Sequence, residues 1–145
     1  MTADRNSDET IDEILDAARV FAVVGASNKP ERASYGVMKV LIANGYTVHP
    51  INPGLAGQDI HGRRVYARLD DVPAPIDVVD VFRNSNDALS VVRDAIRLRE
   101  TLAIKTVWLQ LGVINEQAID EAEAVGLHAV MDRCPAIEFR RRGLR

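Results

Sequence analysis

Short apolar runs alternate with amphipathic stretches along most of this chain. The apolar runs predict buried strands at 20–24, 46–51, 76–82, 104–109 and 127–131, and a short edge strand near 63–66. Apolar positions three or four residues apart predict helices at 34–43, 84–100 and 115–126, and a first helix that begins at Ser7 or Thr10 and runs to Arg19. Ser85 and Asn115 stand where the caps of two of these helices are expected.

The alternation of strands and helices predicts the fold class. The strand cores are continuously apolar, which is typical of strands covered on both faces. We therefore expect an α/β protein with a doubly wound, mostly parallel sheet in three layers. At 145 residues the chain is expected to form one domain over 9–139, with a flexible N-terminal tail at 1–8 and a basic C-terminal tail at 140–145.

Composition narrows the classes of partner. The net charge is −3 and aromatic residues make up only 5% of the chain, so we expect no nucleic-acid partner. A single cysteine excludes an intramolecular disulfide and favours a cytoplasmic location. The first fifteen residues are polar and acidic, unlike a signal peptide, and no apolar run is long enough to suggest a membrane partner.

The loop after the first strand is the most informative segment. Gly25, Ala26 and Ser27 end an apolar strand, Lys29 and Arg32 follow, and a helical pattern opens near Ser34. A glycine turn that leads into a helix N-terminus is a typical anion site, because the first N–H groups of the helix are unpaired. We interpret this loop as a phosphate site; the alternative is a plain strand-to-helix turn with two solvated cations.

Other loops are expected at the same edge of the sheet. Ligands of doubly wound sheets bind at the carboxyl ends of the strands, where Asn52-Pro53, Phe82-Arg83 and the 110–112 turn would lie. For Asn52-Pro53 and the 110–112 turn, the alternative is a turn chosen for its backbone alone. The first loop lacks the G-x-G-x-x-G spacing, and no acidic residue follows the second strand, which argues against NAD or FAD.

The remaining reactive side chains give weaker signals. Cys134 is a nucleophile with His128 as a nearby base, a partner for a mixed disulfide with a ligand thiol, or a small buried cysteine, and we favour the buried cysteine. The three histidines lack metal-ligand spacing, so no metal site is predicted. Asp77 and Asp80 face opposite sides of one strand. We expect Asp80 to cap a helix or pair with a cation, and Arg140–Arg142 to be a solvated tail.

Five segments together carry a resemblance to a known family: VVGASNKPERASYGVMKVL, YTVHPINP, IDVVDVFR, VWLQLGV and VMDRCPAIE. Across about 11–139 the chain resembles small single-domain CoA-binding proteins of bacteria and archaea. These are similar to the CoA-binding domain of the succinyl-CoA synthetase alpha subunit. The phosphorylated histidine of that synthetase lies in a second domain, and none of the three histidines here stands in a matching context.

The resemblance implies a Rossmann-like domain that holds coenzyme A. Its pantetheine and pyrophosphate would lie over Gly25, Ala26 and Ser27, with Lys29 and Arg32 as phosphate partners. The other residues that the resemblance places around the ligand are Ser34, Tyr35, Asn52, Pro53, Val81, Phe82, Arg83, Gln110, Leu111 and Gly112.

The function expected is binding of CoA or an acyl-CoA, as a non-catalytic binding or sensing module. A subunit or fragment of an acyl-CoA ligase or transferase, and an NAD-binding regulatory protein, are the alternatives. The expected ligand is a small molecule, and a homodimer or an unknown protein partner is left open. Replacing Gly25 by valine is expected to abolish binding with little unfolding.

Overall fold

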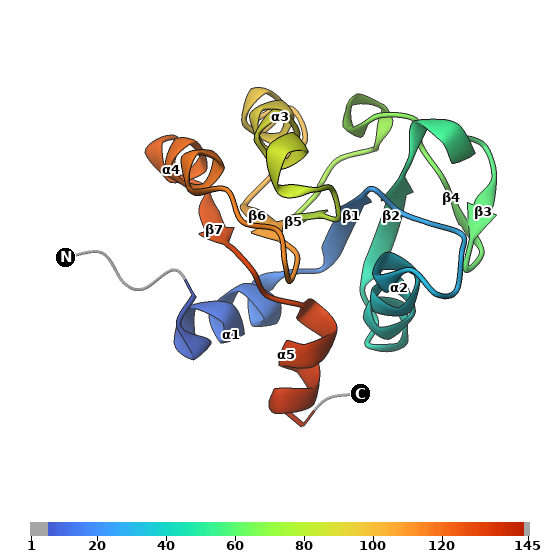
Figure 1. The fold of residues 1–145 in the computed structure, drawn as a ribbon, viewed down its shortest axis with the longest axis horizontal. Helices are drawn as coiled ribbons and strands as arrows, with labels where there is room; N and C mark the ends of the chain where they lie inside the picture. Colours follow the sequence, from blue (N-terminus) through green and yellow to red (C-terminus); the bar gives the residue numbers. More distant parts are fainter. Residues whose placement is uncertain (1–5, 144–145) are drawn as a thin grey trace.

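A five-stranded parallel sheet forms the centre of the molecule (Figure 1). The structure is a computed structural model that describes residues 6–143. The strand order is β2-β1-β5-β6-β7, and every neighbouring pair is parallel, so the expected Rossmann-like α/β class is confirmed. The strands are β1 (Val20–Val24), β2 (Thr47–Ile51), β5 (Val78–Val81), β6 (Thr106–Leu109) and β7 (His128–Val130).

Helices cover both faces of the sheet. One face carries α1 (Asp8–Ala17), α2 (Ala33–Ala43) and α5 (Pro135–Arg141), and the other carries α3 (Ser85–Arg97) and α4 (Glu116–Ala124) (Figure 1). The strand residues alternate between two apolar cores. Trp108 and Val130 belong to the α1, α2 and α5 side, whereas Val107 and Leu109 belong to the α3 and α4 side. This alternation explains why the strands read as continuously apolar.

The connection from β2 to β5 is more elaborate than the sequence pattern predicts. It contains the 3-10 turns η1 (Pro53–Leu55) and η2 (Leu69–Asp71), with an antiparallel hairpin of β3 (Asp59–Ile60) and β4 (Arg63–Arg64) between them. The short strand expected near 63–66 is present as β4, but its pairing differs from the expectation, because it belongs to the hairpin and not to the main sheet. Arg63 and Arg64 pair with β3, and Tyr66 forms one isolated bridge to Ile51.

The helix caps are decided by single side chains. Of the two candidates for α1, Ser7 is the cap, and its Oγ accepts from the Thr10 N–H. The cap of α3 is Asn84, whose side chain accepts from the Asp87 N–H, so the expectation of Ser85 is wrong by one residue. The prediction of Asn115 as the cap of α4 is confirmed.

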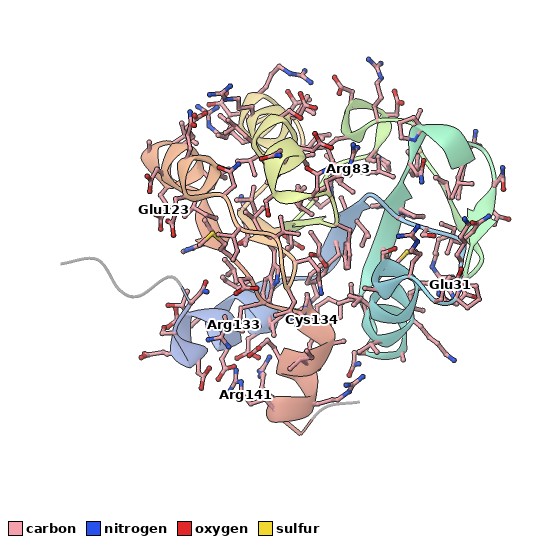
Figure 2. The ribbon with its side chains drawn as sticks, in the orientation of Figure 1. Glu31, Arg83, Glu123, Arg133, Cys134 and Arg141 are labelled. Carbon is pink, nitrogen blue, oxygen red and sulfur yellow. The ribbon has the colours of Figure 1, made fainter. Side chains whose placement is uncertain are left out.

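The basic C-terminal segment is folded back onto α1. Arg140 and Arg141 belong to α5, and the Arg141 side chain lies beside α1 (Figure 2). Arg141 pairs there with Asp12 at 2.6 Å. Arg142 also forms ion pairs, with Asp12 and Asp16. The expected solvated tail is therefore corrected for Arg141 and Arg142, whereas Arg140 is exposed. Positions 1–5 and 144–145 of the two predicted tails lie outside the described residues.

Candidate functional site: a crevice at the carboxyl ends of the strands

The site lies where the direction of strand order changes. From β1 the chain passes first to β2 on one side and later to β5 on the other. The loops that leave the carboxyl ends of β1 and β5 therefore diverge and open a crevice between them. This switch point brings together the loop that begins at Gly25 and the segment that begins at Phe82.

Gly25 is fixed at this point by both conformation and space. Its φ is +89°, which side chains other than glycine rarely adopt. A Cβ placed on Gly25 would lie 2.7 Å from the Phe82 carbonyl oxygen and 3.1 Å from Cδ of Arg83. The Gly25 N–H donates to the Ile51 carbonyl oxygen at 3.0 Å. The turn therefore holds the ends of β1, β2 and β5 close together.

The polar loop after Gly25 is shaped by its own side chains. The Ser27 N–H donates to Oγ of the buried Ser34 at 3.0 Å, and the Lys29 N–H donates to Ser27 Oγ at 3.1 Å. The loop is tied to the end of β2 as well, because Asn52 Nδ2 donates to the Ala26 carbonyl oxygen at 2.8 Å. Loop and helix start are therefore pre-organised by short local hydrogen bonds.

Positive charge and open N–H groups meet at the start of α2. Its N-cap is Arg32, and no side chain caps the helix. The first turn of an uncapped helix carries unpaired N–H groups and the positive end of the helix dipole. Lys29 and Arg32 are exposed, and neither forms an ion pair with another residue in 6–143. An anion placed here would meet both cations and the helix start.

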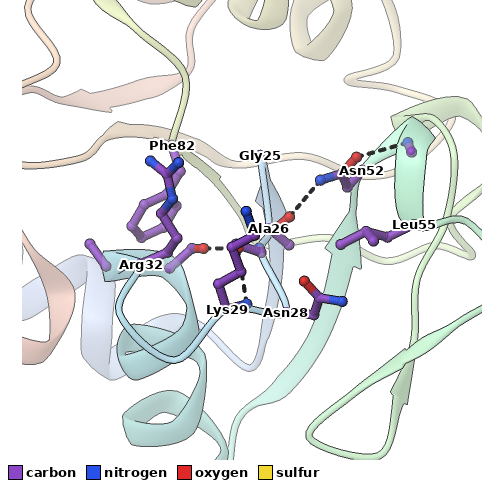
Figure 3. A pocket seen from close by; sticks show the side chains of 12 residues that line it. Gly25, Ala26, Asn28, Lys29, Arg32, Asn52, Leu55 and Phe82 are labelled. Atoms are coloured by element: carbon purple, nitrogen blue, oxygen red, sulfur yellow. Dashed lines mark hydrogen bonds between the residues drawn. The ribbon is translucent and has the colours of Figure 1, made fainter.

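A cavity of about 520 Å³ lies over this helix start (Figure 3). Three loops line it, those after β1, β2 and β5. The lining residues are Gly25, Ala26, Ser27, Asn28, Lys29, Arg32, Ala33, Ser34, Asn52, Gly54, Leu55 and Phe82.

A second cavity of about 500 Å³ adjoins the first and shares Gly25, Asn52 and Phe82 with it. It lies toward α3 and the 67–70 segment, and it includes Pro53, Arg83, Arg68, Leu69, Asp70 and Val91. Arg83 pairs with Asp87 at 3.0 Å, so its charge is partly offset. The two cavities form one elongated crevice of a size suited to a nucleotide-like ligand.

Ten of the fifteen expected site residues line this crevice: Gly25, Ala26, Ser27, Lys29, Arg32, Ser34, Asn52, Pro53, Phe82 and Arg83. The other five lie elsewhere. Tyr35 packs against His61 in a tilted arrangement with ring centroids 4.1 Å apart, and Val81 is buried in the core. Gln110 is buried beside β5, whereas Leu111 is exposed and the Gly112 N–H donates to Asp132.

Sequence reasoning missed several lining residues. Asn28 and Ala33 lie inside the loop that the glycine turn already marked, so including the whole loop would have found them. Gly54 and Leu55 belong to η1. Asn52 is the N-cap of this turn, and its Oδ1 accepts from the Gly54 N–H at 2.8 Å. Arg68 and Asp70 reach the crevice only through the η2 turn, for which the sequence carries no signal.

Asp80 has no hydrogen-bond partner for either carboxyl oxygen among residues 6–143. It is fully buried between Val23 of β1 and Trp108 of β6. Burial raises the pKa of the Asp80 carboxyl well above its ordinary value. The expected helix cap or cation pair is therefore wrong. Asp77 lies just before β5, and its carboxylate accepts hydrogen bonds from the N–H groups of Arg19 and Val20.

Cys134 is buried in the core beneath α5, at the carboxyl end of β7. His128 is exposed at the start of the same strand. The two side chains therefore stand at opposite ends of β7, and the interpretation of Cys134 as a small buried cysteine fits this placement. Among residues 6–143, no group of three His, Cys, Asp or Glu is arranged to hold a metal ion.

A larger cavity of about 900 Å³ lies at the other end of the sheet, at the amino-terminal ends of the strands. Its lining includes Glu13 and Ile14 of α1, Lys105 and His128. Doubly wound sheets bind ligands at the carboxyl ends of their strands, so volume alone does not favour this cavity. Within 6–143, no helix is both long and apolar enough to cross a membrane.

The crevice and the sheet define an α/β protein with a ligand site at the switch point of a parallel sheet. Residues 19–140 match the family model described as CoA binding domain, and the chain belongs to this family. It is 35% identical over 124 residues to the Bacillus subtilis (strain 168) protein YneT. The match covers 86% of this chain and 87% of YneT.

Solved structures show the same fold. A hypothetical protein from Pyrococcus horikoshii OT3 is 37% identical, with a TM-score of 0.85, covering 97% of this chain and 98% of that chain. The dinucleotide-forming acetyl-coenzyme A synthetase 1 of Ca. Korarchaeum cryptofilum is 23% identical, with a TM-score of 0.66. That match covers 83% of this chain and 27% of the synthetase, so the fold corresponds to one part of a larger enzyme.

Proposed function

We propose that this protein binds coenzyme A in the crevice at the carboxyl ends of β1, β2 and β5. The observation that carries the proposal is the uncapped start of α2 beside Lys29 and Arg32, two cations without ion pairs in 6–143. Helix N–H groups and cations together favour phosphate groups, of which coenzyme A has three. Membership of the CoA binding domain family supports the same ligand.

The two cavities suggest how the ligand lies. The pyrophosphate would sit over the Gly25 turn and the first turn of α2, within reach of Lys29 and Arg32. The adenosine would lie in the second cavity beside Asn52 and Pro53. The pantetheine arm would then leave over the Phe82 end of β5, away from β2.

We propose a binding or sensing role rather than turnover. The crevice is lined by cations, amides and small residues, which hold a ligand through charge, backbone geometry and shape. Cys134, the candidate nucleophile of the alternative enzyme reading, is enclosed in the core instead. Turnover of an acyl-CoA by the pure protein would overturn this part of the proposal.

Calorimetric titration with CoA, dephospho-CoA and NAD tests the proposal. Lys29→Ala and Arg32→Ala should each weaken CoA binding by about tenfold, since each removes a charge-assisted contact. Lys39→Ala, an exposed lysine on the same helix outside the crevice, is the matched control and should bind as the wild type. A larger loss for CoA than for dephospho-CoA would place the cation at the 3′-phosphate, and equal losses would place it at the pyrophosphate.

Two outcomes would contradict the proposal. One is the absence of CoA binding by the wild type. The other is equal CoA affinity in the wild type, Lys29→Ala and Arg32→Ala, which would move the ligand away from α2. Displacement of CoA by NAD would favour the dinucleotide-binding alternative.

A further inference from the structure

Two exposed apolar side chains lie just after the carboxyl end of β6, outside the residues that line the crevice. Leu111 is 55% exposed and Ile114 is 51% exposed, and they are the two most exposed large apolar residues among 6–143. Both belong to the loop after β6, whereas Val113 between them points into the core. Apolar side chains that gather beside a binding crevice commonly mark contact with an apolar ligand group.

The loop is rigidly held, so this exposure is a fixed feature of the surface. The Gly112 N–H donates to Asp132 Oδ1 at 2.7 Å, and the Val113 N–H donates to the Gln110 carbonyl oxygen at 2.8 Å. On the other side, the Ile114 N–H donates to Ser85 Oγ at 3.0 Å. The loop is therefore fastened both to the segment after β7 and to the start of α3.

The loop starts close to the crevice, although none of its residues lines the two cavities. It begins where the Gln110 N–H donates to the Val81 carbonyl oxygen at 3.2 Å, one residue before Phe82. Phe82 lines both cavities, so the loop after β6 starts beside their common wall. Neighbouring strands lie about 4.8 Å apart, which places this loop roughly 10 Å from the Gly25 loop across β5.

Polarity changes across this edge of the sheet. The β1 side carries Lys29, Arg32 and the open helix start, and the β6 side carries Leu111 and Ile114. A CoA thioester has the same asymmetry, with phosphates at one end and an acyl chain at the other. Its pantetheine arm is long enough to cross β5, the one strand that separates these sides.

We propose that Leu111 and Ile114 form an acyl-contacting rim, so that the ligand class of the crevice is CoA thioesters with acyl chains of several carbons. This inference rests on the proposed function, since the phosphate end must be held at α2. Contact of the rim with an acyl chain removes apolar surface of both from water, which strengthens binding with each methylene group buried.

Calorimetric titration of the full chain with CoA, acetyl-CoA and octanoyl-CoA tests the rim. The wild type should bind octanoyl-CoA about tenfold more tightly than CoA, the gain expected from roughly two buried methylene groups. The double variant Leu111→Ser/Ile114→Ser should lose this preference and bind the two ligands with equal affinity. Val125→Ser, a 38% exposed apolar residue at the opposite edge, should keep the preference for octanoyl-CoA.

The possible failures separate the two proposals. If CoA binds at the α2 site and octanoyl-CoA binds no more tightly, or if the double variant keeps the preference, the rim is overturned and the proposed function stands. If CoA does not bind at all, the proposed function fails and the rim fails with it. Loss of self-association in the double variant, without an acyl preference in the wild type, would assign the rim to a second copy of the chain.

Discussion

The side chain of Asn52 joins two loops of the crevice, because its Nδ2 donates to the Ala26 carbonyl oxygen at 2.8 Å. Its Oδ1 accepts from the Gly54 N–H, also at 2.8 Å. One amide therefore fixes both the loop after β1 and the turn after β2. The positions of the two loops that line the first cavity therefore depend on Asn52, whether or not its side chain contacts a ligand.

Asn52→Ala should weaken CoA binding by about tenfold, since both loops lose the hydrogen bonds that position them. Titration calorimetry measures the effect. Asn28→Ala is the matched control, because Asn28 lines the same cavity but its side chain forms no hydrogen bond to another segment within 6–143. If Asn28→Ala weakened CoA binding as much as Asn52→Ala does, the loop-joining hydrogen bonds of Asn52 would not explain the loss, and the prediction would be wrong.

Gly25→Ala should destabilise the fold by about 1–3 kcal/mol, because alanine at a φ of +89° is strained and its Cβ would press on the Phe82 carbonyl oxygen. The expectation from the sequence, that valine at Gly25 abolishes binding with little unfolding, is therefore replaced by an expected loss of stability. Gly36→Ala is the control, since a Cβ on Gly36 in α2 meets nothing within 4 Å. Urea denaturation should show Gly36→Ala at least as stable as the wild type, and a fully stable Gly25→Ala would contradict the account.

Asp80 should make the protein less stable as the pH rises. Burial raises the pKa of its carboxyl in the folded state, so above the ordinary value the unfolded chain releases a proton that the folded chain keeps. This contribution is fully present below about pH 4 and is lost as the pH rises toward the raised pKa, by about 1.4 kcal/mol per pH unit. Asp80→Asn should lack this dependence.

Urea denaturation of the wild type and Asp80→Asn between pH 4.5 and pH 8 measures the difference. Other carboxyl groups, such as Asp70 with its lowered pKa, act on both proteins alike and cancel. A difference between the two proteins that stays constant over this range would show that Asp80 is ionised in the folded state.

Arg141→Ala should loosen α1. The guanidinium pairs with Asp12 of α1 and with the buried Glu138, and its removal leaves Glu138 with Arg133 alone among these contacts. Hydrogen exchange of the α1 amides should become several-fold faster, since local opening reports the free energy that holds a segment. Arg140→Ala, on the same helix, is the control and should leave the α1 exchange rates unchanged.

Much of the fold followed from local pattern. The first strand was predicted to the residue, because an unbroken apolar run ends at a glycine that must turn. The cap of α3 was misplaced because Asn84 and Ser85 are both good caps, and tertiary contacts decide which of them serves. Ser85 Oγ is taken by the Ile114 N–H of a distant loop. Helix α5 was not among the predicted helices, although Pro135 in its first turn is a helix-start signal.

The part of the site that was predictable is the part that local sequence pattern marks. Lys29 and Arg32 follow a turn that the sequence marks, so they were found directly. Asp70 was missed because it reaches the crevice through the η2 turn of an irregular connection. The unpartnered state of Asp80 depends on what β1 and β6 place beside it, which no local pattern encodes.

The most direct test of the central claim is a titration of the isotope-labelled protein with CoA, followed by the backbone amide resonances. The account predicts the largest shifts at Gly25, Ser27 and Arg32, with further shifts at Asn52 and Phe82, while the cavity at the opposite edge stays unchanged. Shifts gathered around the 900 Å³ cavity at the start of the strands, or no shifts at all, would contradict it.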